Sequence, residues 1–192
     1  MKPPLTVRQT LNNVAGLRKA VAALTEQDVY VGIPADHTNR EGAQGISNAE
    51  LGYFHEFGAP ANNLPARAAL LPGIRAIQDD AAALLKDAAA SALAGKPGAV
   101  EAALNKIGLL GQNSVRARFV DNDWAPLSDR TLDYRPLKKD DTGAVMTDKK
   151  GNAQRKKSRR ERGNINPLLD SGQLRKAYTY VLRQRQGRMV IK

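Results

Sequence analysis

Residues 97–119, PGAVEAALNKIGLLGQNSVRARF, decide the class of fold that this chain can adopt. Proline suits the first turn of a helix. The apolar side chains that follow it recur at helical spacing, at Val100, Leu104, Ile107, Leu110, Val115 and Phe119. Such a stripe allows one face of a helix to be buried. Residues 72–95 show the same kind of pattern between a proline and a glycine, so the sequence predicts two long consecutive helices.

The core of this protein is expected to be built mainly from small side chains. Alanine supplies much of the apolar content, and aromatic residues make up only 5% of the 192 residues. This composition favours closely packed helices over a large β-sandwich. A capping box at Thr6 and Gln9 predicts a further helix at the N-terminus. Residues 28–34 alternate apolar and polar side chains, as a half-buried strand does.

Shorter elements are predicted on both sides of the two long helices. Ser47 and Glu50 form a second capping box, and the helix that it opens should stop at Gly58. Near the C-terminus, Asp170 is expected to cap a short turn over residues 171–174.

Two last strands complete the predicted fold. Residues 178–182 alternate as a strand, and a glycine turn then precedes another strand around residues 189–191. We therefore predict an α+β fold, in which a small antiparallel sheet, built from residues 29–33 and the C-terminal hairpin, packs against two long helices. Residues 1–134 and 163–192 would form this single domain.

The remaining segment, residues 135–162, is predicted to be a long, extended basic arm or insertion. It holds eleven basic and four acidic residues, a net charge of +7 out of +11 for the chain. No helical or strand period and no internal repeat are apparent in it. The residues expected to face a partner or DNA are Lys149, Lys150, Arg155, Lys156, Lys157, Arg159, Arg160 and Arg162.

Such a charge density cannot build a core of its own. We expect the arm to be ordered from outside, by neighbouring subunits or by DNA. The simpler alternative is a solvated, disordered segment. The basic run at 149–162 contains no aromatic residue, so any contact with nucleic acid would be to the phosphate backbone and would not read sequence.

The composition also restricts the compartment in which the protein is made. The chain has no cysteine, which excludes disulfides and thiolate metal sites. The N-terminus lacks the apolar core of a signal peptide, and no apolar run approaches the roughly 20 residues that span a bilayer. We expect a soluble protein, with no membrane contact, that assembles in a reducing cytoplasm.

No catalytic constellation is visible in the sequence. The two histidines, His37 and His55, lie in a polar loop and on the predicted short helix, and neither belongs to a metal or nucleophile motif. The aspartates at 121, 123, 129 and 133 lack the glycine and terminal glutamate of a calcium loop, so a solvated loop is the better interpretation. We expect no enzyme, no cofactor and no metal.

Two groups of residues carry a family resemblance. The first comprises Val31-Gly32-Ile33-Pro34, the stretch AELGYFHEFG at 49–58, and Leu64-Pro65-Ala66-Arg67. It resembles the signature of small tail-completion and neck proteins of tailed bacteriophages. The second comprises WAPLS at 124–128 with Thr131, and LLDSGQL at 168–174. It is similar to the signature of the phage virion-morphogenesis family.

The resemblance implies a structural virion protein of the neck that joins head and tail, in a tail-terminator, tail-completion, connector or collar role. It would form a homo-oligomeric ring, a hexamer or a dodecamer, around the DNA channel. It would contact other neck and tail proteins, and the basic arm would reach a neighbouring subunit, another neck protein or the backbone of the channel DNA. The expected subunit-interface residues are Phe57, Gly58, Pro65, Arg67, Trp124 and Pro126.

Three alternatives remain open at this point. The chain could be a sequence-nonspecific nucleic-acid-binding protein that uses residues 149–162, or a hydrolase whose site matches no known motif. Trp124 could cover the ends of the predicted helices instead of anchoring an interface.

Overall fold

The computed structural model describes residues 14–40, 45–96, 98–121 and 123–185. It confirms an α+β fold with a small antiparallel sheet. In chain order the elements are α1 (Val14–Thr25), β1 (Gln27–Gly32), the 3-10 turn η1 (Ala35–His37), α2 (Asn48–Phe57), η2 (Pro60–Asn62), α3 (Leu70–Ala76), α4 (Gln78–Leu93), α5 (Gly98–Asp121), α6 (Asp129–Asp133), α7 (Gln173–Ala177) and β2 (Thr179–Gln184).

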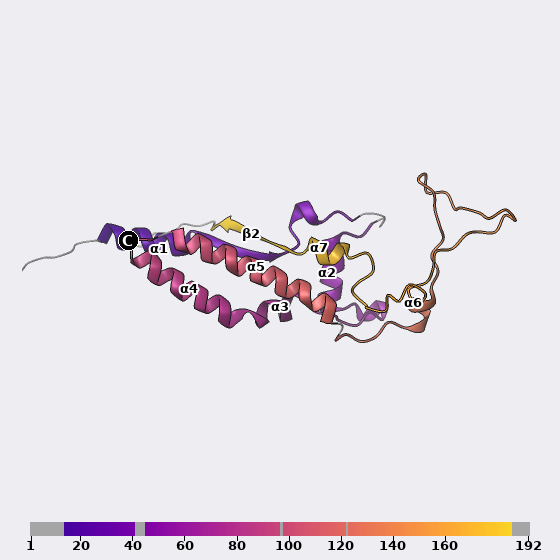
Figure 1. The fold of residues 1–192 in the computed structure, drawn as a ribbon, viewed down its shortest axis with the longest axis horizontal. Coiled ribbons are helices and arrows are strands. Elements are labelled where there is room, and N and C mark those ends of the chain that lie inside the picture. The colour runs from indigo at the N-terminus through magenta and orange to yellow at the C-terminus, as the bar shows by residue number, and fades with distance from the viewer. Residues whose placement is uncertain (1–13, 41–44, 97, 122, 186–192) are drawn as a thin grey trace, which may run out of the picture.

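The helix α5 is the centre of the fold. It packs against β1 and β2 on one side and against α3 and α4 on another, while α1 lies on α4 (Figure 1). Its buried positions recur every three or four residues along the helix, at Val100, Ala103, Leu104, Ile107, Gly108, Gly111, Gln112, Val115 and Phe119. This stripe confirms the helix predicted from residues 97–119, although Pro97 itself lies outside the described residues.

Glycines allow the neighbours of α5 to approach its backbone closely. A Cβ at Gly108 would lie 2.2 Å from the ring of Tyr180, and one at Gly111 would lie 2.9 Å from Val31. At a third contact the glycine belongs to the neighbouring helix and not to α5. A Cβ at Gly73 of α3 would lie 2.8 Å from the backbone of Val115 in α5. Real Cβ contacts do not occur at such distances, so the helix layer and the sheet need glycine at these contacts.

The sheet consists of β1 and β2, paired antiparallel from Gln27↔Gln184 to Gly32↔Thr179. Polar side chains of α5 attach it to the helix. Thr179 Oγ1 donates to Gln112 Oε1 over 2.8 Å, and Tyr180 Oη donates to Asn105 over 3.2 Å. The predicted last strand at 189–191 and the Thr6–Gln9 capping box lie outside the described residues.

The predicted single helix over residues 72–95 is wrong in detail. The structure has two helices, α3 and α4, which meet at Ile77 with φ −106° and ψ 7°. The break lets α3 seat Gly73 on α5 while α4 follows α5 along a different line. Asp79 and Asp80 then occupy the first turn of α4, where carboxylates complement the helix dipole.

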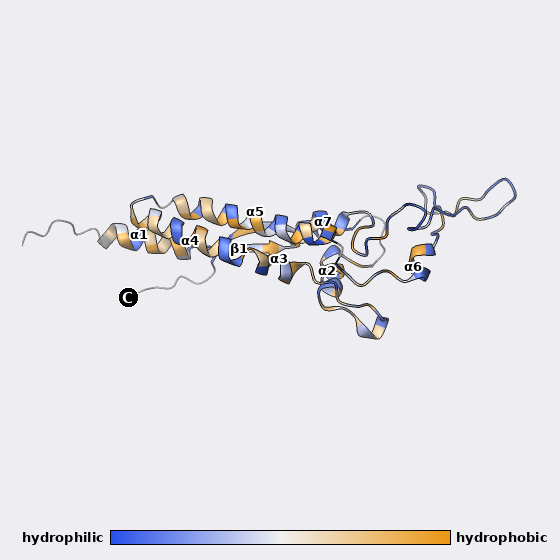
Figure 2. Cartoon of the chain, turned by 60° about the horizontal axis from the view of Figure 1, so that its bottom comes forward, coloured by the Kyte–Doolittle hydropathy of each residue, from blue (hydrophilic) through white to orange (hydrophobic). Residues whose placement is uncertain are grey.

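The molecule is elongated, with α1 at one end of its long axis and the segment after α6 projecting at the other (Figure 1). That projecting segment is predominantly hydrophilic, whereas the helices and strands carry the apolar faces (Figure 2). None of the described helices combines the length and apolarity needed to cross a bilayer.

The contact between Gly108 and Tyr180 can be tested by adding one methyl group. Because the new Cβ would overlap an aromatic ring, Gly108→Ala should lower the free energy of unfolding by about 2 kcal/mol, despite the higher helix propensity of alanine. Urea denaturation followed by circular dichroism measures this loss. Gly98→Ala, where a Cβ meets nothing within 4 Å, is the matched control and should change stability little. Equal stability of the two variants would contradict the packing described.

Candidate assembly site

The helix α2 begins and ends as the sequence predicts. Ser47 Oγ accepts from Glu50 N over 3.1 Å, and Glu50 Oε2 accepts from Ser47 N over 2.8 Å, which completes the capping box. At the other end Gly58 has φ 76°, a conformation that favours glycine. A Cβ there would also lie 2.9 Å from Ala66 N. The chain therefore turns back sharply after α2.

Three aromatic side chains gather on the outside of α2. Tyr53, Phe54 and Phe57 are 62%, 37% and 59% exposed. The ring centroid of Tyr53 lies 6.2 Å from that of Phe54 and 4.8 Å from that of Phe57. Since the whole chain has only nine aromatic residues, three exposed rings gathered around Tyr53 form an unusual surface. We call these three residues the aromatic face.

The glutamate between these aromatics points the other way, into the protein. Glu56 is 8% exposed, and its carboxylate accepts from three consecutive backbone N–H groups. Oε2 accepts from Ala69 and Leu70 over 2.9 Å each, and Oε1 accepts from Leu71 over 2.8 Å. These are donors at the start of α3 that have no partner within the helix. Glu56 thus caps α3 from another element and fixes the angle between α2 and α3.

The structure places Arg67 differently from the prediction. This predicted interface residue is 5% exposed and lies inside its own chain, where Nη2 donates to Ala125 O over 3.3 Å. Its backbone N–H donates to His55 O over 2.6 Å. The expectation that Arg67 faces a neighbouring subunit is therefore wrong for this fold. Arg67 instead connects the turn after α2 to the loop of Trp124.

Of the other predicted interface residues, Phe57, Pro65 and Pro126 are exposed, and Gly58 is half-buried. Trp124 is half-buried as well, packed on the core cluster at the end of α5. The guanidinium carbon of Arg118 lies 5.3 Å from the centroid of its ring. Part of the ring therefore covers the end of α5, as the alternative interpretation of Trp124 proposed.

Burial changes the titration of two groups beside Glu56. Burial, together with the charges of Arg67 and Arg40, lowers the pKa of His55 to about 4. Burial, with a contribution from the Glu56 carboxylate, raises the pKa of Tyr178 to about 12. Both side chains are therefore neutral at pH 7.

The two groups of motif residues, far apart in sequence, meet in one core cluster. Leu168, Leu174 and Tyr178 from the second half of the chain pack with Ala69, Val115 and Phe119, and Val31, Ile33, Leu51 and Trp124 lie against them. The helices α2 and α7 are in contact there. Sequence reasoning did not place the two signatures side by side, because no periodicity links them.

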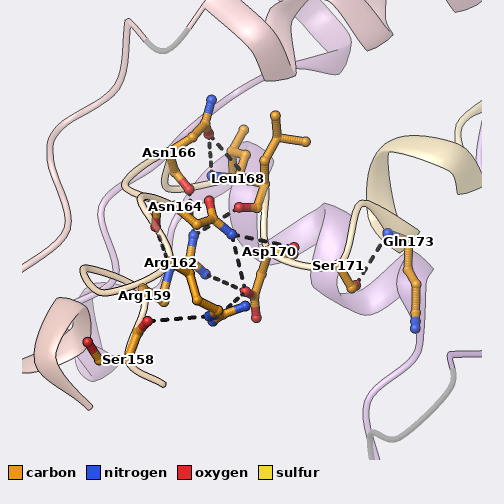
Figure 3. A network of polar contacts seen from close by, with 10 residues as sticks. Ser158, Arg159, Arg162, Asn164, Asn166, Leu168, Asp170, Ser171 and Gln173 are labelled. Atoms are coloured by element: carbon orange, nitrogen blue, oxygen red, sulfur yellow. Dashed lines mark hydrogen bonds and ion pairs between the residues drawn. The ribbon is translucent and has the colours of Figure 1, made fainter. Parts of the chain in front are cut away.

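We had expected Asp170 to cap the turn that forms α7, and this is wrong. The N-cap residue of α7 is Gly172, with φ 74°. Asp170 instead holds the end of the basic segment (Figure 3). Its Oδ1 lies 3.2 Å from Arg162 Nη2 and 3.5 Å from Arg159 Nη1. Arg159 also donates to the carbonyls of Asn164, Asn166 and Leu169. Residues 158–162 thus pack onto the body of the protein, and Ser158 is 3% exposed.

Further ion pairs hold this segment to α6. Ser128 caps α6, since its Oγ accepts from Thr131 N over 3.4 Å. Arg160 then donates to Asp129 over 2.6 Å and to Asp133 over 2.7 Å, and its hydrogen bond lowers the pKa of Asp133. Arg135 pairs with Glu161 at 2.5 Å. Arg159, Arg160 and Arg162, which we had expected to face a partner or DNA, are therefore engaged within the chain.

The rest of the arm, residues 136–156, is organised by its own backbone. Lys138 N donates to Gln154 O over 2.9 Å, Gln154 N to Met146 O over 2.8 Å, and Met146 N to Lys138 O over 3.0 Å. These three hydrogen bonds form a closed triangle, from which three short legs extend, each made of two paired chain segments (Figure 1). Two of the legs end in tight turns. The third leg is the base, where the two ends of the segment pair and Lys156 N donates to Pro136 O over 2.8 Å. We call residues 136–156 the tripod.

The tripod contains an internal repeat that the sequence analysis did not find. KKDDTGAV at 138–145 and MTDKKGNA at 146–153 share only an aspartate and a glycine, eight residues apart. Their backbone pairings are equivalent: the bridge Lys139↔Val145 becomes Thr147↔Ala153 by a step of eight, and the three donors of the triangle, at 138, 146 and 154, are also eight residues apart. The expectation that all order in the arm comes from outside is therefore wrong.

Each repeat turns around its aspartate. Asp140 Oδ1 accepts from the hydroxyl and N–H of Thr142 and from Ala144 N. Asp148 Oδ1 accepts from Asn152 N and Lys150 N. The Thr142 hydroxyl foremost lowers the pKa of Asp140, and the Asn152 N–H foremost lowers that of Asp148. The turning glycines, Gly143 and Gly151, have φ 86° and 80°.

Among the described residues, no group of three or more histidine, aspartate or glutamate side chains could hold a metal ion. Asp121 and Asp123, considered as ligands above, each lie 3.3 Å from Arg118. Compared with models of protein families, with curated protein sequences and with solved structures, the chain matches none. What it does is therefore inferred from its own residues.

The cap formed by Glu56 predicts a graded loss of stability. Glu56→Ala leaves three backbone N–H groups without an acceptor and should lower the free energy of unfolding by about 3 kcal/mol or more. Glu56→Gln keeps one acceptor oxygen and should lose about half as much. Urea denaturation measures both, with the exposed Glu101→Ala as the control, which should stay within about 0.5 kcal/mol of wild type. A loss below about 1 kcal/mol for Glu56→Ala would rule out the cap.

Proposed function

We propose that this chain is a non-enzymatic structural protein of a tailed bacteriophage, from the neck that joins head and tail. It forms a ring of several copies, six or twelve, around the DNA channel, in a tail-completion, terminator, connector or collar role. It assembles in the host cytoplasm and remains in the virion. One observation carries this proposal: the two signature segments meet at one end of the molecule, which carries the aromatic face and the base of the tripod.

The aromatic face supports an assembly role because a cluster of exposed large apolar side chains commonly marks a protein–protein interaction site. Aromatic side chains are enriched in the buried centres of protein interfaces, where large rings supply most of the binding energy. Here three exposed rings are held on a helix whose start is capped and whose end is fixed by Glu56 and Gly58. A surface prepared in this way can dock on a partner with little loss of conformational freedom.

The tripod supports the same role for a different reason. It projects along the long axis, away from the body (Figure 1), while ion pairs of Arg135, Arg160 and Arg162 fix its base. A ring subunit needs surfaces that reach its neighbours as well as surfaces that face head and tail components. A rigid projection from one end of an elongated subunit meets this requirement.

Electron cryo-microscopy of virions that contain this protein tests the proposal directly. We expect a closed ring of copies at the head–tail junction, with the channel DNA on its axis. Density for the chain in the capsid shell, in the distal tail or in no part of the particle would refute the proposal.

The aromatic face provides the second test. Tyr53→Ser combined with Phe57→Ser should leave the monomer folded, because both side chains are mostly exposed, but should abolish incorporation into particles. Circular dichroism measures folding, and quantitative immunoblotting of purified particles measures incorporation. Leu93→Ser, which changes a side chain of similar exposure on α4, is the control and should incorporate normally. Normal incorporation of the double variant would remove the aromatic face from the interface.

A further inference from the structure

The two turns of the tripod share a backbone but differ in charge. The first, residues 140–143, reads DDTG, and the second, residues 148–151, reads DKKG. In both, the leading aspartate accepts backbone N–H groups within the turn, so its charge is already engaged. The first turn then presents Asp141 and Thr142 to solvent, whereas the second presents Lys149 and Lys150. We call residues 148–151 the lysine tip.

Lysine and arginine have separate roles in the basic segment. The arginines of residues 135–162 all donate within the chain: Arg155 to Arg135 O over 2.9 Å, and the other four in the ion pairs and carbonyl contacts described above. In contrast, the five lysines of the tripod are exposed, and among the described residues their ammonium groups form no ion pair. Apart from Arg155, whose guanidinium contacts only a neutral carbonyl, the unpaired charge of the tripod is therefore lysine charge.

The chemistry around the lysine tip selects the kind of partner. Interface centres between proteins are depleted in lysine and enriched in aromatic residues and arginine. The tripod contains no aromatic residue, so it has no platform on which an exposed base could stack. Its exposed apolar side chains, Val145 and Met146, belong to the central junction and not to the lysine tip. Compact ammonium charges on a fixed turn suit a regularly charged polyanion with little shape to read.

We propose that the lysine tip, through Lys149 and Lys150, binds the phosphate backbone of double-stranded DNA without reading its sequence. Because the tripod holds the turn in place, the two charges reach the backbone with little ordering cost. The binding itself is a property of the isolated protein. Only its place in the virion, at the DNA of the neck channel, rests on the function proposed above.

The equivalence of the two turns supplies a matched experiment. In the full chain, Lys149→Asp with Lys150→Thr gives the second turn the sequence of the first. Conversely, Asp141→Lys with Thr142→Lys gives the first turn the sequence of the second. Both changes keep the aspartate and the glycine that form each turn, and circular dichroism checks that folding is unchanged. Binding of a fluorescent 30-base-pair duplex is then measured by anisotropy between about 50 and 200 mM salt, with two duplexes of unrelated sequence.

We expect wild type to bind both duplexes equally, with an affinity that falls steeply with salt. The loss of the two lysines should weaken binding roughly tenfold at 50 mM salt and reduce the slope of log affinity against log salt by about 2. Two added lysines on the first turn should leave binding equal or stronger. Unchanged binding by the lysine-loss variant overturns the proposal. So does a preference for polyglutamate over the duplex at equal charge, which would indicate an acidic protein partner.

Failure of this proposal and failure of the neck function are distinguishable. If the lysine-loss variant still binds DNA as wild type does but the chain forms a ring in the neck, the DNA contact is wrong and the proposed function stands. If the variant loses DNA binding and no virion contains the chain, the DNA contact stands and the neck function is wrong.

Discussion

The close approach of backbones at α5 is the constraint on which the rest of the structure depends. Gly108 and Gly111 allow Tyr180 and Val31 of the sheet to sit directly on the helix, and Gly73 allows α3 to do the same from another side. These contacts fix where β2 begins, and therefore where Tyr178 and α7 lie. Arg116 adds to this, since its Nε donates to Tyr178 O over 2.9 Å and its Nη2 to Lys176 O over 3.0 Å. The far end of α5 thus becomes the point at which both signature segments collect.

The charged residues in those segments act as structural anchors. Glu56 caps a helix, Asp170 holds Arg162 and Arg159, and Arg67 contacts the carbonyl of Ala125. Two of these anchors lie beside exposed side chains: the aromatic face, in the same signature segment as Glu56, and the tripod, beyond the arginines that Asp170 holds. The surfaces to which we assign assembly therefore lie within or next to the signature segments, and the anchored residues of those segments position them.

The periodic elements could be predicted from sequence, and the non-periodic ones could not. The stripe of α5, the Ser47 capping box and the strand that ends at Gly32 follow from local spacing. The break at Ile77 depends on how α3 meets α5, which local spacing does not encode. The interior position of Arg67 likewise depends on a loop 58 residues away. The repeat in the tripod escaped notice because only two positions in eight are identical, and its order comes from backbone bonds that every residue can make.

The central claim is that the tripod is a preformed projection of the isolated chain, and not a tail that folds only on a partner. Three amides decide it, those of Lys138, Met146 and Gln154, which form the closed triangle. Amide hydrogen exchange of the isolated monomer, followed by NMR, measures their protection. Our account predicts that all three exchange slowly and to a similar extent, well below the rate of the exposed Lys149 amide. Exchange of all three at the rate of an unstructured chain would contradict it.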